Sequence, residues 1–158
     1  MLHPSAYGER CKIGRNLCFF SLVMKTPDEI VGLMFQGDAY SKALGMHVAF
    51  LEAGSCLLQM KVMEHMVNGF NIAHGGITYA LADSAMAFAS NAHGVQCVSI
   101  ETAISHIKKV WVGDTLSASC KELSRNRKVG IYEVEVTNQS NELVAHFKGT
   151  VLVSDREW

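Results

Sequence analysis

One long helix organises this chain, and residues 68–94 encode it as NGFNIAHGGITYALADSAMAFASNAHG. The segment predicts an alanine-rich helix from about Gly76 to Asn91, which follows a His-Gly-Gly turn at residues 74–76. A single carboxylate, Asp83, lies in the middle of this apolar helix. Because an ionised carboxylate in apolar surroundings is costly unless it is paired or used, Asp83 is the first candidate for a functional residue.

The predicted helix has two faces of different character. At about 100° per residue, Ile77, Leu81 and Phe88 fall within a narrow arc and form the stripe that we expect to face a sheet. Asp83 lies on a second face that carries no Lys or Glu, unlike a solvated helix surface. We therefore expect a second copy of the chain to cover this face, which predicts a homo-oligomer. The other residues of the second face are Tyr79, Ala80, Met86, Ala87 and Ser90.

Short runs with strand periodicity lie on both sides of the long helix. A helical segment near Pro27–Phe35 and a further turn or two in residues 38–45 come before two strands separated by the turn sequence AGS. Four more strands follow the helix, and this order predicts an α+β fold in which an antiparallel sheet wraps around one long central helix. The predicted strands are Met46–Glu52, Cys56–Met63, Val95–Ile107, Thr115–Leu123, Lys128–Thr137 and Leu143–Val153.

Composition restricts the class and the compartment of the protein. The chain has 158 residues, a net charge of −1 and 49% hydrophobic residues, which favours a single globular domain without nucleic acid or a membrane as partner. Five cysteines without a Cys-x-x-Cys pair indicate free thiols in a reducing compartment, so we expect a cytoplasmic protein. We place the domain at residues 26–158 and interpret residues 1–25 as an N-terminal extension that is disordered or foreign to the native protein, with Met24 as a candidate natural start. The apolar run in this extension lacks a cleavage site and is too short to span a bilayer.

The turn before the helix and the carboxylate within it suggest chemistry on an acyl group. Glycines at residues 75 and 76 let a ligand approach the backbone, and the free N–H groups of a helix N-terminus stabilise an oxyanion. Asp83 comes eight residues after Gly75, which is roughly 12 Å along a helix. Both groups must reach within roughly 3 Å of the reacting atoms. We therefore expect one site to combine Gly75 of one chain with Asp83 of another, while a hydrogen-bonded structural role at an interface remains the alternative for Asp83.

Four segments carry a resemblance to a known family: MFQGDAYSKALGM, NGFNIAHGGITYALADSAMAFASN, VGDTLSASCKEL and GIYEVEVTNQSNELVAHFKGT. Together they resemble the phenylacetate-pathway (PaaI-type) acyl-CoA thioesterases of the hotdog fold. The resemblance covers about residues 34–154, and its most specific part is the spacing between His-Gly-Gly and Leu-Ala-Asp. It implies a CoA thioester substrate, a homodimer or homotetramer with the active site at the dimer interface, and no cofactor.

The resemblance also implies catalytic roles for four residues. The backbone N–H of Gly75 would polarise the thioester carbonyl, and His74 would shape the turn that presents it. Asn68 would orient the nucleophilic water or the thioester. Asp83 matches the catalytic carboxylate, and both a nucleophilic and a general-base role remain open. No metal site is expected, because His65 and His74 lack partners at metal-ligand spacing.

Candidate contacts to the substrate come from three parts of the sequence. The stretch HIKK at residues 106–109 departs from the family, which leaves the acyl preference open. A basic cluster at residues 125–128 is suited to CoA phosphates, although for each residue taken singly a solvated hairpin end is the slightly favoured explanation. His106 has a nucleotide contact and a plain strand position as alternatives. The full set of candidate substrate-binding residues is Gly76, Tyr79, Met86, His106, Lys108, Arg125, Arg127 and Lys128.

Hydrolysis of an aryl acyl-CoA, such as phenylacetyl- or hydroxyphenylacetyl-CoA, to free acid and CoA is the function that the resemblance favours. One alternative is a hotdog dehydratase or hydratase, although no H-x-D-x-N-P run is present. Another is a non-catalytic acyl-CoA-binding protein, which would bind its ligand without turnover. A chain without a G-x-S-x-G elbow offers no serine hydrolase motif.

Overall fold

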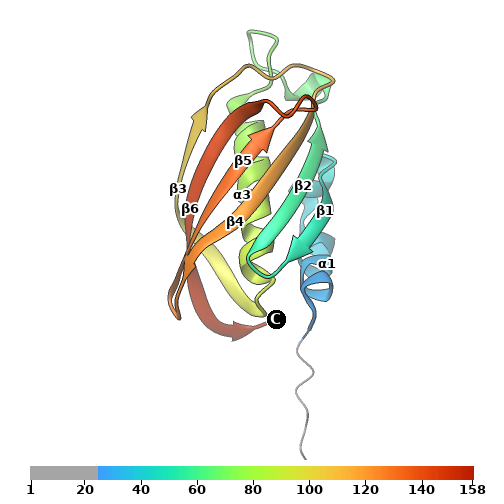
Figure 1. Ribbon diagram of the computed structural model, residues 1–158. Coiled ribbons are helices and arrows are strands. Elements are labelled where there is room, and N and C mark those ends of the chain that lie inside the picture. The colour runs from blue at the N-terminus through green and yellow to red at the C-terminus, as the bar shows by residue number, and fades with distance from the viewer. Residues whose placement is uncertain (1–24) are drawn as a thin grey trace, which may run out of the picture.

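A six-stranded antiparallel sheet curves around one long helix in the computed structural model, which describes residues 25–158 (Figure 1). The helix is α3, Gly75–Asn91, and the strand order is β1-β2-β4-β5-β6-β3. The predicted α+β architecture is thereby confirmed, while the predictions about residues 1–24, including a start at Met24, lie outside the described residues. The strands are β1 His47–Glu52, β2 Ser55–Lys61, β3 Val95–His106, β4 Thr115–Arg125, β5 Val129–Thr137 and β6 Leu143–Glu157.

Strand β6 is longer than its sequence pattern predicts. Alternation of apolar and polar residues breaks down after Val153, yet the strand continues to Glu157. It does so because it pairs with β3 as far as Val95, which lies opposite Glu157. The end of β6 is therefore a strand because it pairs with β3, not because of its own sequence pattern. This pairing brings Trp158 back toward the end of α3, where its main-chain N–H donates to Gly94 O at 3.2 Å.

Two short helices at the N-terminal end of the described chain pack beside α3. Helix α1, Pro27–Gly37, begins with a capping box in which Thr26 and Glu29 satisfy each other's backbone N–H groups. Helix α2, Ala39–Ala43, is capped by Asp38, whose Oδ1 accepts a hydrogen bond from Ser41 N at 2.9 Å. A 3-10 turn, η1 Glu64–Met66, leads from β2 toward the loop before α3.

The faces of α3 differ in part from the prediction. Ile77, Leu81 and Phe88 are buried as expected, but Met86 is also fully buried. A Cβ built on Gly149 of β6 would lie 2.3 Å from Met86 Sδ, so the methionine packs directly beneath the sheet. The assignment of Met86 to the second face was therefore wrong, because helical wheel position alone does not show how far a curved sheet wraps around the helix. Ala80 and Ser90, placed on the same face, are buried as well.

The cover of the second face also differs from the prediction. Asp83 and Ala87 of that face line a cavity together with Met34 of α1 and Tyr40 of α2. Beside this cavity, Ser41 Oγ of α2 lies 3.2 Å from Ser84 Oγ of α3, and the rings of Phe35 in α1 and Phe88 in α3 lie 6.0 Å apart. The chain's own N-terminal helices therefore cover part of the face that we had assigned to a second copy. The reason is the short connection from α2 into β1, which holds both helices against the same side of the sheet as α3.

Cysteines in the described part of the chain are core residues. Cys56, Cys97 and Cys120 are buried free thiols. Burial raises the pKa of the Cys56 thiol to about 12, which leaves it protonated and unreactive at neutral pH. None of the helices that the structure describes has the length and apolar character needed to cross a bilayer.

Candidate active site

The His-Gly-Gly turn forms the N-terminus of α3, and His74 is its capping residue. The Gly76 N–H donates a hydrogen bond to His74 Nδ1 at 3.0 Å. The His74 N–H in turn donates to Met66 O at 2.8 Å, which ties the turn to η1. Gly75 is the first residue of the helix, so its own N–H has no acceptor within the helix. The turn thus occupies the N–H of Gly76 and leaves that of Gly75 for a ligand.

A cavity of about 320 Å³ lies at this end of the helix, and we call it the Gly75 cavity. Of the predicted site residues, it brings together Asn68, Gly75, His106 and Lys108. Asn68 Oδ1 accepts a hydrogen bond from Phe70 N at 2.9 Å, which shapes the loop and leaves the amide nitrogen of the side chain as its donor. The rest of the lining is formed by Ile72, Ala73, Thr78, Ile107, Lys109 and Val110.

Thr78 is a site residue that the sequence analysis missed. Its Oγ1 donates to Gly75 O at 3.0 Å and lies 3.2 Å from His106 Nδ1. The threonine therefore links the first turn of α3 to the end of β3. His106 approaches Gly75 so closely that a Cβ built there would lie 2.9 Å from His106 Nε2. A hydroxyl one turn after the glycines was the available signal, because a threonine at that position can bond back to the helix N-terminus.

Asp83 lies in a second cavity of about 500 Å³, which we call the Asp83 cavity. Its walls come from α1, α2 and α3, with Met34, Tyr40, Phe88 and Trp158 among them. Asp83 Oδ1 is inaccessible to solvent and has no hydrogen-bond partner within the described chain. Burial raises the pKa of Asp83, because the low-dielectric surroundings disfavour the charged form. A half-buried carboxylate that lines a cavity, with a raised pKa and one oxygen without a partner in the described chain, has the properties of a general base or a nucleophile.

The N–H donor and the carboxylate of the predicted reaction lie in different cavities of one chain. Gly75 lines one cavity and Asp83 lines the other. Both residues belong to α3, where eight residues correspond to roughly 12 Å. One chain by itself therefore does not present the N–H donor and the carboxylate to the same substrate carbonyl.

Tyr79 and Met86 do not line either cavity. Tyr79 turns toward the sheet, where its hydroxyl lies 2.7 Å from Thr102 Oγ1 and its ring meets Phe147 edge-on at 5.6 Å. Met86 is enclosed beneath Gly149 and reaches no surface of this chain. Packing against the sheet thus accounts for both side chains.

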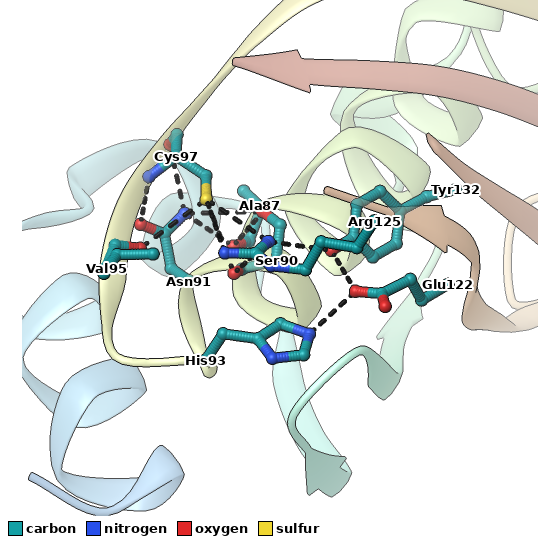
Figure 2. Close-up of polar contacts among 9 residues, drawn as sticks. All are labelled: Ala87, Ser90, Asn91, His93, Val95, Cys97, Glu122, Arg125 and Tyr132. Atoms are coloured by element: carbon teal, nitrogen blue, oxygen red, sulfur yellow. Dashed lines mark hydrogen bonds and ion pairs between the residues drawn. The ribbon is translucent and has the colours of Figure 1, made fainter. Parts of the chain in front are cut away.

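The predicted basic cluster at residues 125–128 is divided by the structure. Figure 2 shows the Arg125 guanidinium turned inward, where Nη1 lies 3.3 Å from Tyr132 OH, 3.5 Å from Ser90 O and 3.7 Å from Cys97 Sγ. The Arg125 side chain therefore packs against the end of α3. Arg127 and Lys128 are exposed at the β4–β5 turn, and neither lines the Gly75 cavity or the Asp83 cavity.

The residues around Arg125 form a polar network that the sequence analysis did not identify (Figure 2). Tyr132 OH donates to Glu122 Oε2 at 2.6 Å, and His93 Nε2 lies 2.7 Å from the same oxygen. Glu122 follows Cys120 at the two-residue spacing that keeps both on the inner face of β4. An acidic residue at an inward position of a strand was the signal that could have revealed the network.

Lys108, which lines the Gly75 cavity together with Lys109, is held at the surface. Its Nζ lies 2.7 Å from Glu142 Oε1, and both side chains are about half exposed. Within residues 25–158, no three His, Cys, Asp or Glu side chains gather closely enough to hold a metal ion.

Comparisons with known proteins agree with this geometry. A family model described as the thioesterase superfamily matches residues 70–145, which contain Gly75 and Asp83. A putative esterase of Archaeoglobus fulgidus is 32% identical over 90% of this chain and 92% of its own length. The acyl-coenzyme A thioesterase PaaI of Escherichia coli is 34% identical over 73% of this chain and 83% of its own length.

Solved structures extend the likeness to the fold. The structure of the E. coli PaaI protein superposes with a TM-score of 0.81 and 30% identity, and covers 83% of this chain and 95% of that one. A Streptococcus mutans protein solved with bound acetyl CoA superposes with a TM-score of 0.69 and 26% identity, over 72% of this chain and 91% of that one. The likeness in fold thus agrees with the sequence relationship. The chain belongs to the thioesterase superfamily, in its PaaI-type branch of hotdog-fold thioester hydrolases.

Proposed function

We propose that this protein hydrolyses acyl-CoA thioesters, with an aryl acyl-CoA such as phenylacetyl- or hydroxyphenylacetyl-CoA as substrate. The observation that carries the proposal is Asp83, which lines a cavity of about 500 Å³ and whose buried Oδ1 lacks a hydrogen-bond partner within the described residues. A relative that is 34% identical is named an acyl-coenzyme A thioesterase, and a structural relative holds acetyl CoA. These likenesses support the same substrate class for this chain.

The reaction that we propose divides the chemistry between a donor and a carboxylate. The Gly75 N–H donates to the thioester carbonyl oxygen and stabilises the negative charge that develops on it. Asp83 either attacks the carbonyl carbon directly or removes a proton from a water that attacks it. In both cases the carbon–sulfur bond breaks, CoA leaves as the thiol after taking up a proton, and water supplies the new oxygen of the acid. Asn68, on the loop beside Gly75, would orient the water or the thioester.

We propose that the complete site forms between two chains. The separation of Gly75 and Asp83 into different cavities supports this arrangement. Strand β3 lies at an edge of the sheet and exposes Val98 and Ile100 by 59% and 56%. Pairing of two β3 edges around a two-fold axis would place two α3 helices side by side and antiparallel, with Gly75 of each near Asp83 of the other. Such a pair is a homodimer, and a homotetramer would contain two of them.

The CoA portion of the substrate would meet the cations nearest the Gly75 cavity. Lys108 and His106 line this cavity and are suited to phosphate and nucleotide groups. Arg127 and Lys128 are exposed and would contribute through longer-range attraction. CoA thioesters and reduced cysteines both belong to the cytoplasm, which is the location that we propose.

A panel of acyl-CoAs tests the function. Purified protein is incubated with phenylacetyl-, hydroxyphenylacetyl-, acetyl- and palmitoyl-CoA, and thiol release is followed with a colorimetric thiol reagent. We expect thiol release from the aryl substrates with the highest kcat/KM. Tight binding of every CoA thioester without thiol release would identify a binding protein, and hydration of an enoyl-CoA without thiol release would identify a hydratase.

A further inference from the structure

Trp158 occupies a defined position beside the catalytic helix. Its main-chain N–H donates to Gly94 O at 3.2 Å, and its indole Nε1 donates to Asn91 Oδ1 at 2.8 Å. The main-chain oxygen of Trp158 accepts a hydrogen bond from Lys25 Nζ. Backbone and ring are thus both held, so the indole has one orientation relative to the end of α3.

The partner of the indole is itself immobile. Asn91 is 1% exposed, and its Nδ2 donates to Ala87 O at 2.9 Å and to Cys97 O at 3.1 Å. Its Oδ1 accepts from Cys97 N at 2.9 Å as well as from the indole of Trp158. Figure 2 shows how this amide joins the last turn of α3 to the start of β3. A side chain anchored in this way holds the tryptophan as a fixed wall.

That wall belongs to the Asp83 cavity. Trp158 lines it together with Phe88, Met34 and Tyr40, and Asp83 supplies a half-buried carboxylate. Asp38, Ser41 and Ser84 add polar groups to the lining. Aromatic walls combined with polar groups that orient a ligand are typical of small-molecule sites. The proposed function places the acyl carbonyl next to Asp83, so the acyl group itself must extend from that carboxylate along these walls.

We propose that Trp158 is a specificity-determining residue, which closes the Asp83 cavity and selects ring-sized acyl groups over long acyl chains. The inference rests on the proposed function, because it assigns the acyl group of that reaction to this cavity. A flat ring gains an aromatic contact with the indole in addition to its buried area. A long chain meets the same indole as an obstacle, because moving the ring aside breaks its hydrogen bond to Asn91 Oδ1.

The kcat/KM values of Trp158→Ala for a series of acyl-CoAs test whether Trp158 determines specificity. We expect the variant to lose roughly tenfold in kcat/KM for phenylacetyl-CoA, mainly through KM, since the contact exists before and during the chemical step. It should gain at least about threefold for palmitoyl-CoA while butanoyl-CoA changes little, because a short chain does not reach the wall. Trp158→Phe should keep the aryl preference, and Trp111→Ala is the matched control, since Trp111 is 52% exposed and lines neither cavity. An unchanged ratio of phenylacetyl-CoA to palmitoyl-CoA rates in Trp158→Ala would overturn the inference and leave hydrolysis standing.

Fluorescence gives a second measurement that does not depend on turnover. The chain contains two tryptophans, so Trp111→Phe leaves Trp158 as the only one. With Asp83→Asn added to prevent hydrolysis, phenylacetyl-CoA should change the Trp158 emission and CoA alone should not. Equal responses to both ligands, or none to phenylacetyl-CoA, would refute the placement of the acyl group. Absence of thiol release by the wild type would instead refute the proposed function, and the emission change would still report whether the cavity takes an acyl group.

Discussion

Two inactive variants of this protein should restore each other's activity when their subunits are combined. Asp83→Asn removes the base or nucleophile, and such a loss lowers kcat by about a hundredfold or more. Gly75→Ala adds a Cβ that would lie 2.9 Å from His106 Nε2, so the N–H donor or the imidazole must move. Loss of one oxyanion donor costs on the order of 3 kcal/mol, which again lowers kcat by at least about a hundredfold. Each parent variant should therefore be nearly inactive.

The recovered activity follows from two-fold symmetry. In a mixed dimer, the intact Gly75 of the Asp83→Asn chain faces the intact Asp83 of the Gly75→Ala chain, while the second site has lost both groups. Random reassociation of equal amounts yields mixed dimers as about half of the total, each with one active site, so activity should return to about a quarter of wild type. Mixed dimers purified through two different affinity tags should reach about half.

The assay is thiol release from phenylacetyl-CoA after co-expression of the two tagged chains. The control pairs Asp83→Asn with the double variant Asp83→Asn/Gly75→Ala, which contains no Asp83 at all and should stay inactive. If purified mixed dimers are folded and remain as inactive as their parents, the two groups act within one chain and our account of the separate cavities is refuted.

Further predictions concern single residues. Burial raises the pKa of Asp83 in the folded state, so its contribution to the free energy of unfolding is fully present below the unfolded pKa and is lost as pH rises through the folded pKa. Asp83→Asn should therefore raise Tm at neutral pH in calorimetry, and an unchanged Tm would contradict the cost of burying the charge. Wild-type kcat should rise with pH as Asp83 loses its proton, with a midpoint above the ordinary range for aspartate, and a flat pH profile would argue against this group. Replacement of Arg127 and Lys128 by alanine should raise KM for acyl-CoA at low salt only, which steady-state kinetics will show. Arg125→Ala should leave KM unchanged and lower the free energy of unfolding, measured with denaturant, by about 1–3 kcal/mol, because it removes the hydrogen bonds to Ser90 O and Tyr132 OH. Gly149→Ala should lower the free energy of unfolding by about 1–3 kcal/mol, because its Cβ would lie 2.3 Å from the sulfur of the methionine beneath it, and a neutral effect would show that this side chain repacks freely.

Periodicity along the chain was sufficient to predict the elements of this fold. The alanine-rich helix after the glycines extends over Gly75–Asn91, one residue longer than predicted, and the six strands appear where apolar alternation and turn residues indicated them. Such signals are local, because helix and strand periods are set by the backbone itself. The spacing between Gly75 and Asp83 is local in the same sense, and it predicts that one chain does not bring both groups to one substrate; in the structure the two residues line different cavities.

Long-range packing decided the features that the sequence did not reveal. Whether Arg125 points into solvent or against the end of α3 depends on Tyr132 and Ser90, which become its neighbours only after the sheet has curved around the helix. Pairing with β3 extends β6 beyond its own pattern and brings Trp158 to the Asp83 cavity, 75 residues away in sequence from the carboxylate. Local periodicity reports which face of an element is apolar, but the neighbours of each face are set by the free energy of the whole packed arrangement, in which groups distant in sequence exclude water together.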